Sequence, residues 1–232
     1  MNYQDRAVVV TGGTGALGTA VVAALLASGA ICHVPYLDEH RIQHFPYRGH
    51  ECVKLVGGCD LADERGVARL FDGIDNLWAS IHIAGGFAMN PIVDTDKAGL
   101  LAMVETNLVS CYLCCRAAVR AMAHGAGGRI VNVAARQALE PRAGAGMTSY
   151  TVSKAAVAAL TEALAQEVVG NGILVNAVAP SIMDTPQNRQ AMPKANYEAW
   201  PKVEEVAATI LFLASPENRV TRGAVVSVYG KS

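Results

Sequence analysis

The sequence has little charge and few aromatic residues. Charged residues make up 17% and aromatic residues 6% of its 232 residues, and the formal net charge at pH 7 is −1. This balance leaves no basic surface of the kind that binds nucleic acid or an anionic membrane. No uninterrupted apolar stretch reaches the ~20 residues that span a bilayer. We therefore expect neither nucleic acid nor a membrane as a partner.

Other absences narrow the class further. Residues 1–6 are polar and lack the charged and apolar regions of a secretory signal, which favours a cytoplasmic location. The sequence contains no internal repeat, linker or low-complexity segment. Its 232 residues, of which 52% are hydrophobic, suffice for one large core and are few for two. We expect a single domain over residues 1–232.

Metal-ligand patterns are scarce. Cys111 and Cys114 have C-x-x-C spacing, but no second pair of this kind and no paired His accompanies them. The six His residues are scattered, and the six Cys residues are typical of small, buried apolar side chains. We expect no metal site.

A glycine-rich turn is the first positive pattern. Residues 7–10 (Ala-Val-Val-Val) indicate a short buried strand, and residues 19–28 indicate a helix. Between them, Gly13, Gly15 and Gly18 satisfy G-x-G-x-x-G. Glycines at these positions let backbone N–H groups approach a pyrophosphate at the helix N-terminus. The pattern predicts a dinucleotide site that includes Gly12, Thr14, Gly15, Ala16, Leu17 and Gly18.

A second pattern carries chemistry. Tyr150 and Lys154 stand four residues apart, on one face of an expected helix. A free phenol has a pKa near ~10, and a neighbouring ammonium group lowers that value toward the working range of an acid or base. A Tyr and a Lys at this spacing are common on solvated helices. Residues 150–154 therefore indicate a catalytic pair only in combination with the glycine-rich turn upstream.

Strands and helices alternate along the whole chain. The strands are apolar without alternation, as in a parallel sheet covered on both faces. We predict an α/β fold: a single-domain, Rossmann-type doubly wound parallel sheet of about seven strands, with ligand at the strands' carboxyl ends. Expected strands span residues 7–11, 31–36, 52–57, 78–83, 128–134, 174–179 and 225–228. Expected helices span residues 15–28, 64–71, 95–124, 149–170 and 203–214. The long irregular segment 181–202 is a predicted substrate loop or lid.

Together the two patterns resemble the short-chain dehydrogenase/reductases, over essentially all 232 residues. The resemblance implies NAD(P)-dependent hydride transfer between nicotinamide and a small carbonyl, quinonoid or imine-type substrate. It implies that Tyr150 is the acid/base and that Lys154 lowers the Tyr150 pKa and binds the nicotinamide ribose. Asn107 would hold a water that links Lys154 to solvent.

Further stretches fit the same family. Residues 60–61 resemble its adenine-contacting acid, and residues 82–86 (His-Ile-Ala-Gly-Gly) resemble its Asn-Asn-Ala-Gly turn with both Asn replaced. Residues 175–180 resemble the segment beside the nicotinamide, although Ser181 stands where Gly is usual. The resemblance implies cofactor contacts from Tyr36, Asp60, Leu61, Ala84, Gly85, Gly86, Pro180, Ile182 and Thr185.

The choice between NAD and NADP stays open, with a lean toward NAD. Asp38 lies 20 residues after Gly18, where an acid would bind the adenosine ribose, but Tyr36 occupies the more usual strand-end position. His40 and Arg41 are close enough in sequence to bind a phosphate instead.

One departure from the family bears on chemistry. Where the family places its catalytic Ser, this chain has Ala134-Ala135, and counting back from Tyr150 gives Gln137. This change resembles the dihydropteridine-reductase-like branch. Either the substrate needs less polarisation, or Gln137, Thr148 or a water supplies it. Predicted substrate contacts are Phe87, Gln137, Met147 and Trp200.

Because the catalytic Ser is missing, functions other than hydride transfer stay open. The chain could be a catalytically silent subunit or dinucleotide sensor, or could use the tyrosine for another reaction such as dehydration. Whichever function holds, the family resemblance implies a homo-oligomer. It would be a tetramer or a dimer that packs through helices 95–124 and 149–170.

Overall fold

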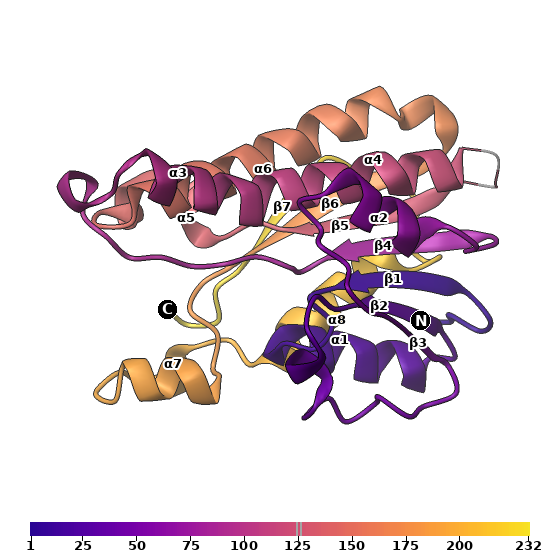
Figure 1. Cartoon of the computed structure of the whole chain (residues 1–232), viewed down its shortest axis with the longest axis horizontal. Helices are drawn as coiled ribbons and strands as arrows, with labels where there is room; N and C mark the ends of the chain where they lie inside the picture. The colour runs from indigo at the N-terminus through magenta and orange to yellow at the C-terminus, as the bar shows by residue number, and fades with distance from the viewer. Residues whose placement is uncertain (124, 126) are drawn as a thin grey trace.

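One parallel sheet organises the chain (Figure 1). The computed structural model describes residues 1–123, 125 and 127–232. The strands are β1 (Ala7–Thr11), β2 (Ile31–Pro35), β3 (Val53–Val56), β4 (Leu77–His82), β5 (Gly128–Val133), β6 (Ile173–Pro180) and β7 (Val225–Val228). Their order is β3-β2-β1-β4-β5-β6-β7. The predicted doubly wound α/β sheet of seven strands is confirmed, and each strand ends within one residue of its expected position.

Helices cover both faces of the sheet. In Figure 1, α1 (Ala16–Ala27) and α8 (Val203–Ala214) lie on one side and pack against each other. On the other side lie α2 (Glu64–Phe71), α4 (Ser110–Met122) and α6 (Thr148–Glu167). Because both faces are covered, the residues of β1 and β5 are buried without exception. This explains their apolar, non-alternating sequences.

The expected helix 95–124 is wrong in its middle. It divides into α3 (Lys97–Val104), a π-helical turn (Glu105–Val109) and α4. Asp96 caps α3 by accepting a hydrogen bond from Gly99 N at 2.8 Å. The predicted end at His124 lies outside the described residues. A π-helical turn inserts one extra residue into a helix and often marks a functional site, and this one carries Asn107.

The continuous helical run Lys97–Met122 bears on the expectation that no segment could span a membrane. It is 26 residues long and apolar enough, by length and composition alone, to cross a bilayer. In the fold, α4 packs against β4 and also contacts α2 and α6.

The segment 181–202 is not wholly irregular, which corrects the prediction. It contains α7 (Pro186–Ala191), where Pro186 occupies the first turn and Thr185 Oγ1 accepts from Asn188 N at 3.2 Å. Both features favour a helix start. Figure 1 shows α7 set apart from the helices that cover the sheet. The remaining short elements are α5 (Arg136–Leu139) and the 3-10 turns Glu39–Ile42, Ile92–Asp94, Pro141–Gly144, Val169–Asn171 and Tyr197–Ala199.

Candidate active site

The glycine-rich turn follows β1 at the point where the strand order reverses. Gly12 has φ +66, and a Cβ there would lie 2.7 Å from the backbone N of Ala84. That Ala84 N donates a hydrogen bond to Thr11 Oγ1 at 3.2 Å. A Cβ on Gly18 would collide with the backbone of Gly12 and Gly13. The turn therefore depends on close backbone contacts that only glycine permits.

A cleft of about 510 Å³ opens between this turn and the ends of β2 and β3. Seven residues predicted to contact the cofactor line it: Gly12, Thr14, Tyr36, Asp60, Leu61, Ala84 and Gly85. The Tyr36 hydroxyl donates to Glu39 Oε1 at 2.8 Å. Arg41 also lines the cleft. We refer to this cavity as the adenosine cleft.

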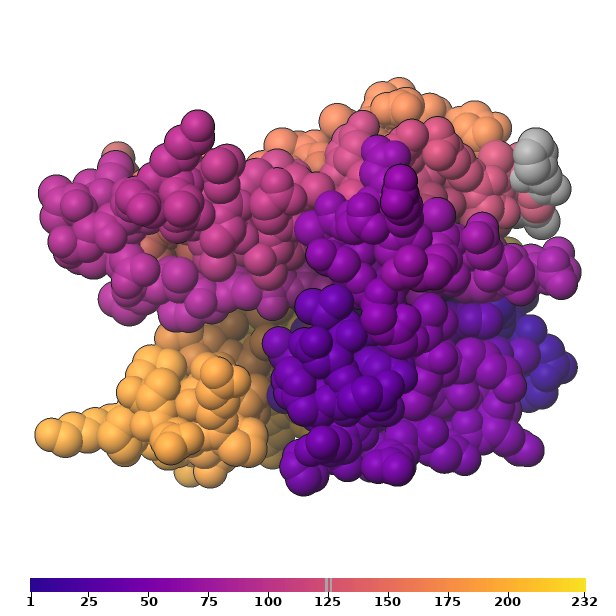
Figure 2. All heavy atoms as spheres, viewed as in Figure 1, coloured from indigo at the N-terminus to yellow at the C-terminus, as the bar shows by residue number. Residues whose placement is uncertain are grey.

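A second cleft, of about 690 Å³, lies beside the first and shares Gly85 with it. Its predicted members are Ala16, Leu17, Gly85, Gly86, Phe87, Tyr150, Lys154, Pro180 and Thr185. Gln187 and Asn188 of α7 also line it and were missed, because residues 181–202 were expected to be irregular and the helix-start signal of Thr185 and Pro186 was not used. Figure 2 shows a hollow between the magenta segment above and the orange segment that contains α7. We refer to this cavity as the Tyr150 cleft.

Tyr150 stands in the wall of its cleft with a mainly apolar surrounding. Its ring meets the ring of Phe87 edge-on, with 5.0 Å between centroids. Burial raises the pKa of the Tyr150 phenol to about 12. The phenol is therefore protonated at neutral pH.

Lys154 is buried, and its Nζ donates to the carbonyl oxygen of Val133 at 2.8 Å. Burial lowers the pKa of Lys154 to about 8. The expected lowering of the Tyr150 pKa by the ammonium group is thus wrong here. Desolvation dominates at the phenol, and the ammonium group is bound to a backbone carbonyl.

Asn107 is fixed by the backbone of the turn after β4. Its Oδ1 accepts from Gly86 N at 2.9 Å, and its Nδ2 donates to Gly86 O at 3.1 Å. Nδ2 also lies 3.1 Å from Ser153 Oγ, one residue before Lys154. Asn107 therefore joins the π-helical turn, the cofactor-side turn and the helix that carries Tyr150.

The position of the missing Ser is occupied by a methyl group. Ala134 and Ala135 are buried and line the Tyr150 cleft. Of the predicted substrate contacts, Phe87 lines this cleft, whereas Gln137, Met147 and Trp200 are not among its lining residues. Trp200 is buried instead, with its ring 5.1 Å from that of Tyr197. Among the predicted cofactor contacts, Gly15, Gly18 and Ile182 line neither cleft.

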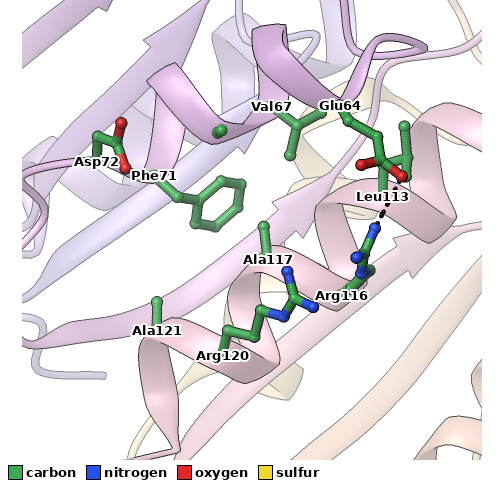
Figure 3. Close-up of a pocket in the computed structure, with 10 residues that line it drawn as sticks. Glu64, Val67, Phe71, Asp72, Leu113, Arg116, Ala117, Arg120 and Ala121 are labelled. Carbon is green, nitrogen blue, oxygen red and sulfur yellow. Dashed lines mark hydrogen bonds and ion pairs between the residues drawn. The ribbon is translucent and has the colours of Figure 1, made fainter.

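A third cavity, of about 420 Å³, lies between α2 and α4 (Figure 3). Phe71, Ala117 and Ala121 border it, and Arg116 Nη1 forms an ion pair with Glu64 Oε1 at 2.9 Å. None of the predicted catalytic, cofactor or substrate residues lines this cavity. The two clefts at the strand ends are the candidate active site.

Comparison with known proteins agrees with this geometry. The family model described as enoyl-(acyl carrier protein) reductase matches residues 13–230. The chain is 34% identical to galactitol 2-dehydrogenase of Rhizobium johnstonii over 250 residues, which cover 98% of this chain and 97% of that protein. It is 30% identical to a short-chain type dehydrogenase/reductase of Picea abies, over 97% of this chain and 91% of that protein.

Solved structures show the same fold. A short chain dehydrogenase/reductase family protein superposes with a TM-score of 0.90 at 28% identity, over 99% of this chain and 98% of that one. ElxO with NADP bound superposes with a TM-score of 0.87 at 25% identity, over 98% of both chains. The chain belongs to the short-chain dehydrogenase/reductase family of NAD(P)-dependent oxidoreductases.

Proposed function

We propose that the chain reduces a small carbonyl, quinonoid or imine-type substrate, with Tyr150 as proton donor. When bound, the reduced nicotinamide supplies the hydride. The observation that carries the proposal is the position of Tyr150: a phenol protonated at neutral pH, in the same cleft as Ala16 and Leu17 of the glycine-rich turn. A protonated phenol suits the reductive direction, because an acid must deliver a proton as the hydride arrives.

Lys154 and Asn107 support this step. Lys154 lines the Tyr150 cleft beside Gly85 and Gly86, where its ammonium group would bind the nicotinamide ribose. Asn107 holds Gly86 and the Ser153–Lys154 region at a fixed separation. We propose that it also holds a water that renews the proton through Lys154.

The substrate class follows from what the cleft lacks. Ala135 offers no hydroxyl to polarise a substrate oxygen, and loss of one such donor typically costs ~100-fold or more in rate. An electron-poor quinonoid or imine acceptor needs less polarisation, as the likeness to dihydropteridine reductases also suggests. Gln187 and Asn188 are the polar side chains of α7 on this cleft, and we propose that they bind the substrate. Residues 181–202 then act as the lid, with Phe87 as the apolar wall.

We propose NAD as the preferred cofactor. The carboxylate of Glu39, held on Tyr36 at the edge of the adenosine cleft, would repel the extra phosphate of NADP. Arg41 in the same cleft acts in the opposite sense. Titration of the protein with NADH and with NADPH compares the two, and tighter binding of NADPH would reverse the assignment. We further propose a cytoplasmic homo-oligomer that consists of a single domain per chain.

Turnover of an acceptor panel tests the proposed reaction. Quinonoid, imine and dicarbonyl compounds are offered with either reduced dinucleotide, and its oxidation is followed at the nicotinamide absorbance. The proposal expects the electron-poor acceptors to be reduced fastest. Dinucleotide binding without turnover of any acceptor would favour the catalytically silent alternative.

A further inference from the structure

Four polar side chains meet behind the active site, on the inner side of α4. They are His82 at the end of β4, Asn132 on β5, and Cys111 and Cys115 on α4, and all four are buried. Ligand atoms of His82, Cys111 and Cys115 lie within 4.8 Å of one another. The two Cys residues are four positions apart, so both point from the same face of the helix toward the sheet. We call these four residues the buried cluster.

Several potential hydrogen-bond donors in the cluster share one acceptor. Three potential donors converge on Asn132 Oδ1: His82 Nδ1 at 2.8 Å, Cys111 Sγ at 3.3 Å and Cys115 Sγ at 3.5 Å. A carbonyl oxygen has two lone pairs. Cys115 Sγ also lies 3.5 Å from His82 Nδ1 and forms a side-chain hydrogen bond with Cys111. Asn132 Oδ1 cannot accept from all three groups at once.

Hydrogen bonds to residues outside the cluster fix the orientation of His82 and Asn132. His82 Nε2 lies 2.7 Å from Ser80 Oγ, which leaves Nδ1 to face the two sulfur atoms. Asn132 Nδ2 donates to Thr161 Oγ1 at 2.9 Å, while that hydroxyl donates to Val157 O at 2.8 Å. The Asn132 amide is therefore held with its oxygen toward the cluster. Ligating side chains in metal sites are typically fixed by second partners of this kind.

The separations fit a tetrahedral ion. With bonds of about 2.3 Å to sulfur and about 2.1 Å to nitrogen or oxygen, a sulfur lies about 3.5 Å from a neighbouring nitrogen or oxygen ligand. The observed pairs are 3.5 Å for Cys115 Sγ with His82 Nδ1, and 3.3 and 3.5 Å for the two sulfurs with Asn132 Oδ1. Among these four pairs, only His82–Asn132, at 2.8 Å, must open, by about 0.6 Å. The Cys111 sulfur lies within 4.8 Å of the ligand atoms of His82 and Cys115.

We propose that the buried cluster binds one Zn²⁺ ion through His82 Nδ1, Cys111 Sγ, Cys115 Sγ and Asn132 Oδ1. Binding releases two thiol protons, so that two thiolates and Zn²⁺ form a neutral unit, which suits burial. His82 ligates as neutral imidazole and donates its Nε2–H to Ser80. The ion ties α4 to β4 and β5, one helical turn beyond Asn107. It is structural, because no ligand position faces the Tyr150 cleft.

Cobalt substitution in the full chain tests the site. Since all four side chains are buried, Zn²⁺ or Co²⁺ is offered during expression and during refolding from denaturant. We expect about one zinc per chain by elemental analysis. The cobalt form should show thiolate-to-metal charge transfer and the visible bands of tetrahedral Co²⁺, which surface His residues do not give. A chain that takes up neither ion, or shows no thiolate charge transfer, overturns the proposal without any variant.

Variants then assign the ligands. Cys115→Ser and His82→Asn should each weaken metal binding more than about 100-fold, and Ser80→Ala should weaken it by about 10- to 100-fold. Cys114→Ala is the matched control, because Cys114 is buried on the same helix but lies outside the cluster. It should keep full metal content and charge transfer. Unchanged binding in both Cys115→Ser and His82→Asn would refute the assignment.

Discussion

At the scale of single residues, burial sets the protonation of Tyr150 and Lys154. Lys154 is buried and Tyr150 is largely enclosed in the wall of its cleft, so the neutral form of each is favoured. The phenol is thereby kept as an acid, and the ammonium group is easier to deprotonate than an exposed one. The pair is poised to pass a proton toward substrate.

Tyr150→Phe tests the proton donor directly. The ring and its contact with Phe87 remain, so dinucleotide affinity should hardly change, while turnover should fall by about 100- to 10,000-fold. Steady-state rates and calorimetric binding of the dinucleotide measure the two effects. Tyr112→Phe, on an exposed tyrosine of α4, is the control. Near-full activity of Tyr150→Phe would remove the phenol from the mechanism.

Burial of Lys154 should make the free energy of unfolding depend on pH. Between pH 8 and 10.5 its amine binds a proton in the unfolded chain but not in the folded one. The free energy of unfolding therefore rises with pH over this window, and the benefit is absent below it, where both states are protonated. Relative to Lys154→Met, the wild type should gain on the order of 3 kcal/mol across the window. Urea denaturation at several pH values measures this, and parallel profiles for the two proteins would contradict it.

At the glycine-rich turn, a single added side chain should abolish dinucleotide binding. Gly18→Val places a side chain against the backbone of Gly12 and Gly13, so the turn cannot keep its shape. We expect dinucleotide binding to be lost while circular dichroism retains most of the fold. Gly49→Val is the control, because a Cβ there meets nothing within 4 Å. Calorimetry that shows unaltered affinity for Gly18→Val would place the dinucleotide elsewhere.

Residues whose role depends on backbone geometry could be recognised from the sequence. The pKa of a side chain, which depends on its burial in the fold, could not. The glycine positions follow from the G-x-G-x-x-G spacing between an expected strand and an expected helix, because a dinucleotide-binding turn needs glycine there. The direction of the Tyr150 pKa did not follow from its spacing to Lys154. It depends on how much water reaches the phenol, which only the packed fold determines.

At the scale of elements, the π-helical turn Glu105–Val109 separates α3 from α4 and carries Asn107 between the cofactor-side turn and α6. Its residues have ordinary helical character, so periodicity predicted one uninterrupted helix. Asn107 makes its polar contacts across 21 and 46 positions of the chain. Such long-range contacts cannot be recognised in a local sequence pattern.

Asn107→Ala should weaken both stability and activity. Gly86 N and O would lose their side-chain partner in a half-buried place, at a cost of about 1–3 kcal/mol in the free energy of unfolding. Turnover should fall with it, since Gly86 lines the Tyr150 cleft. Denaturant titration and kinetics on the same samples measure both. Ser28→Ala, which removes a hydroxyl that bonds only to Ala24 O at the end of α1 and lines neither cleft, is the control. An unchanged midpoint would mean that Asn107 does not hold the turn.

At the scale of the whole molecule, the doubly wound parallel sheet and the two helical layers followed from the alternation of apolar strands with helices. The surface that would form the proposed homo-oligomer, on helices 95–124 and 149–170, stays a prediction. On α4 and α6, Tyr112 and Val152 are about half exposed, whereas Ala118 on α4 is buried in the core. Only part of the surface of each helix is therefore exposed to contact a copy of the chain.

Light scattering should return at least the mass of a dimer at micromolar concentration. Tyr112→Asp combined with Val152→Asp should lower that mass, because charges would be forced into an apolar contact. Val220→Asp, at another exposed valine, should leave it unchanged. A monomer mass for the wild type would show that the chain acts alone.

The strand order also governs when the glycine-rich turn can form during synthesis. β1 emerges first and lies between β2 and β4, and Gly12 packs against the backbone of Ala84. Until residue 82 has left the ribosome, β1 lacks its second neighbour. Pairings between distant parts of a chain form slowly, and an apolar strand that waits is open to wrong partners. The glycine-rich turn therefore cannot bind a dinucleotide until β4 and Ala84 have joined β1.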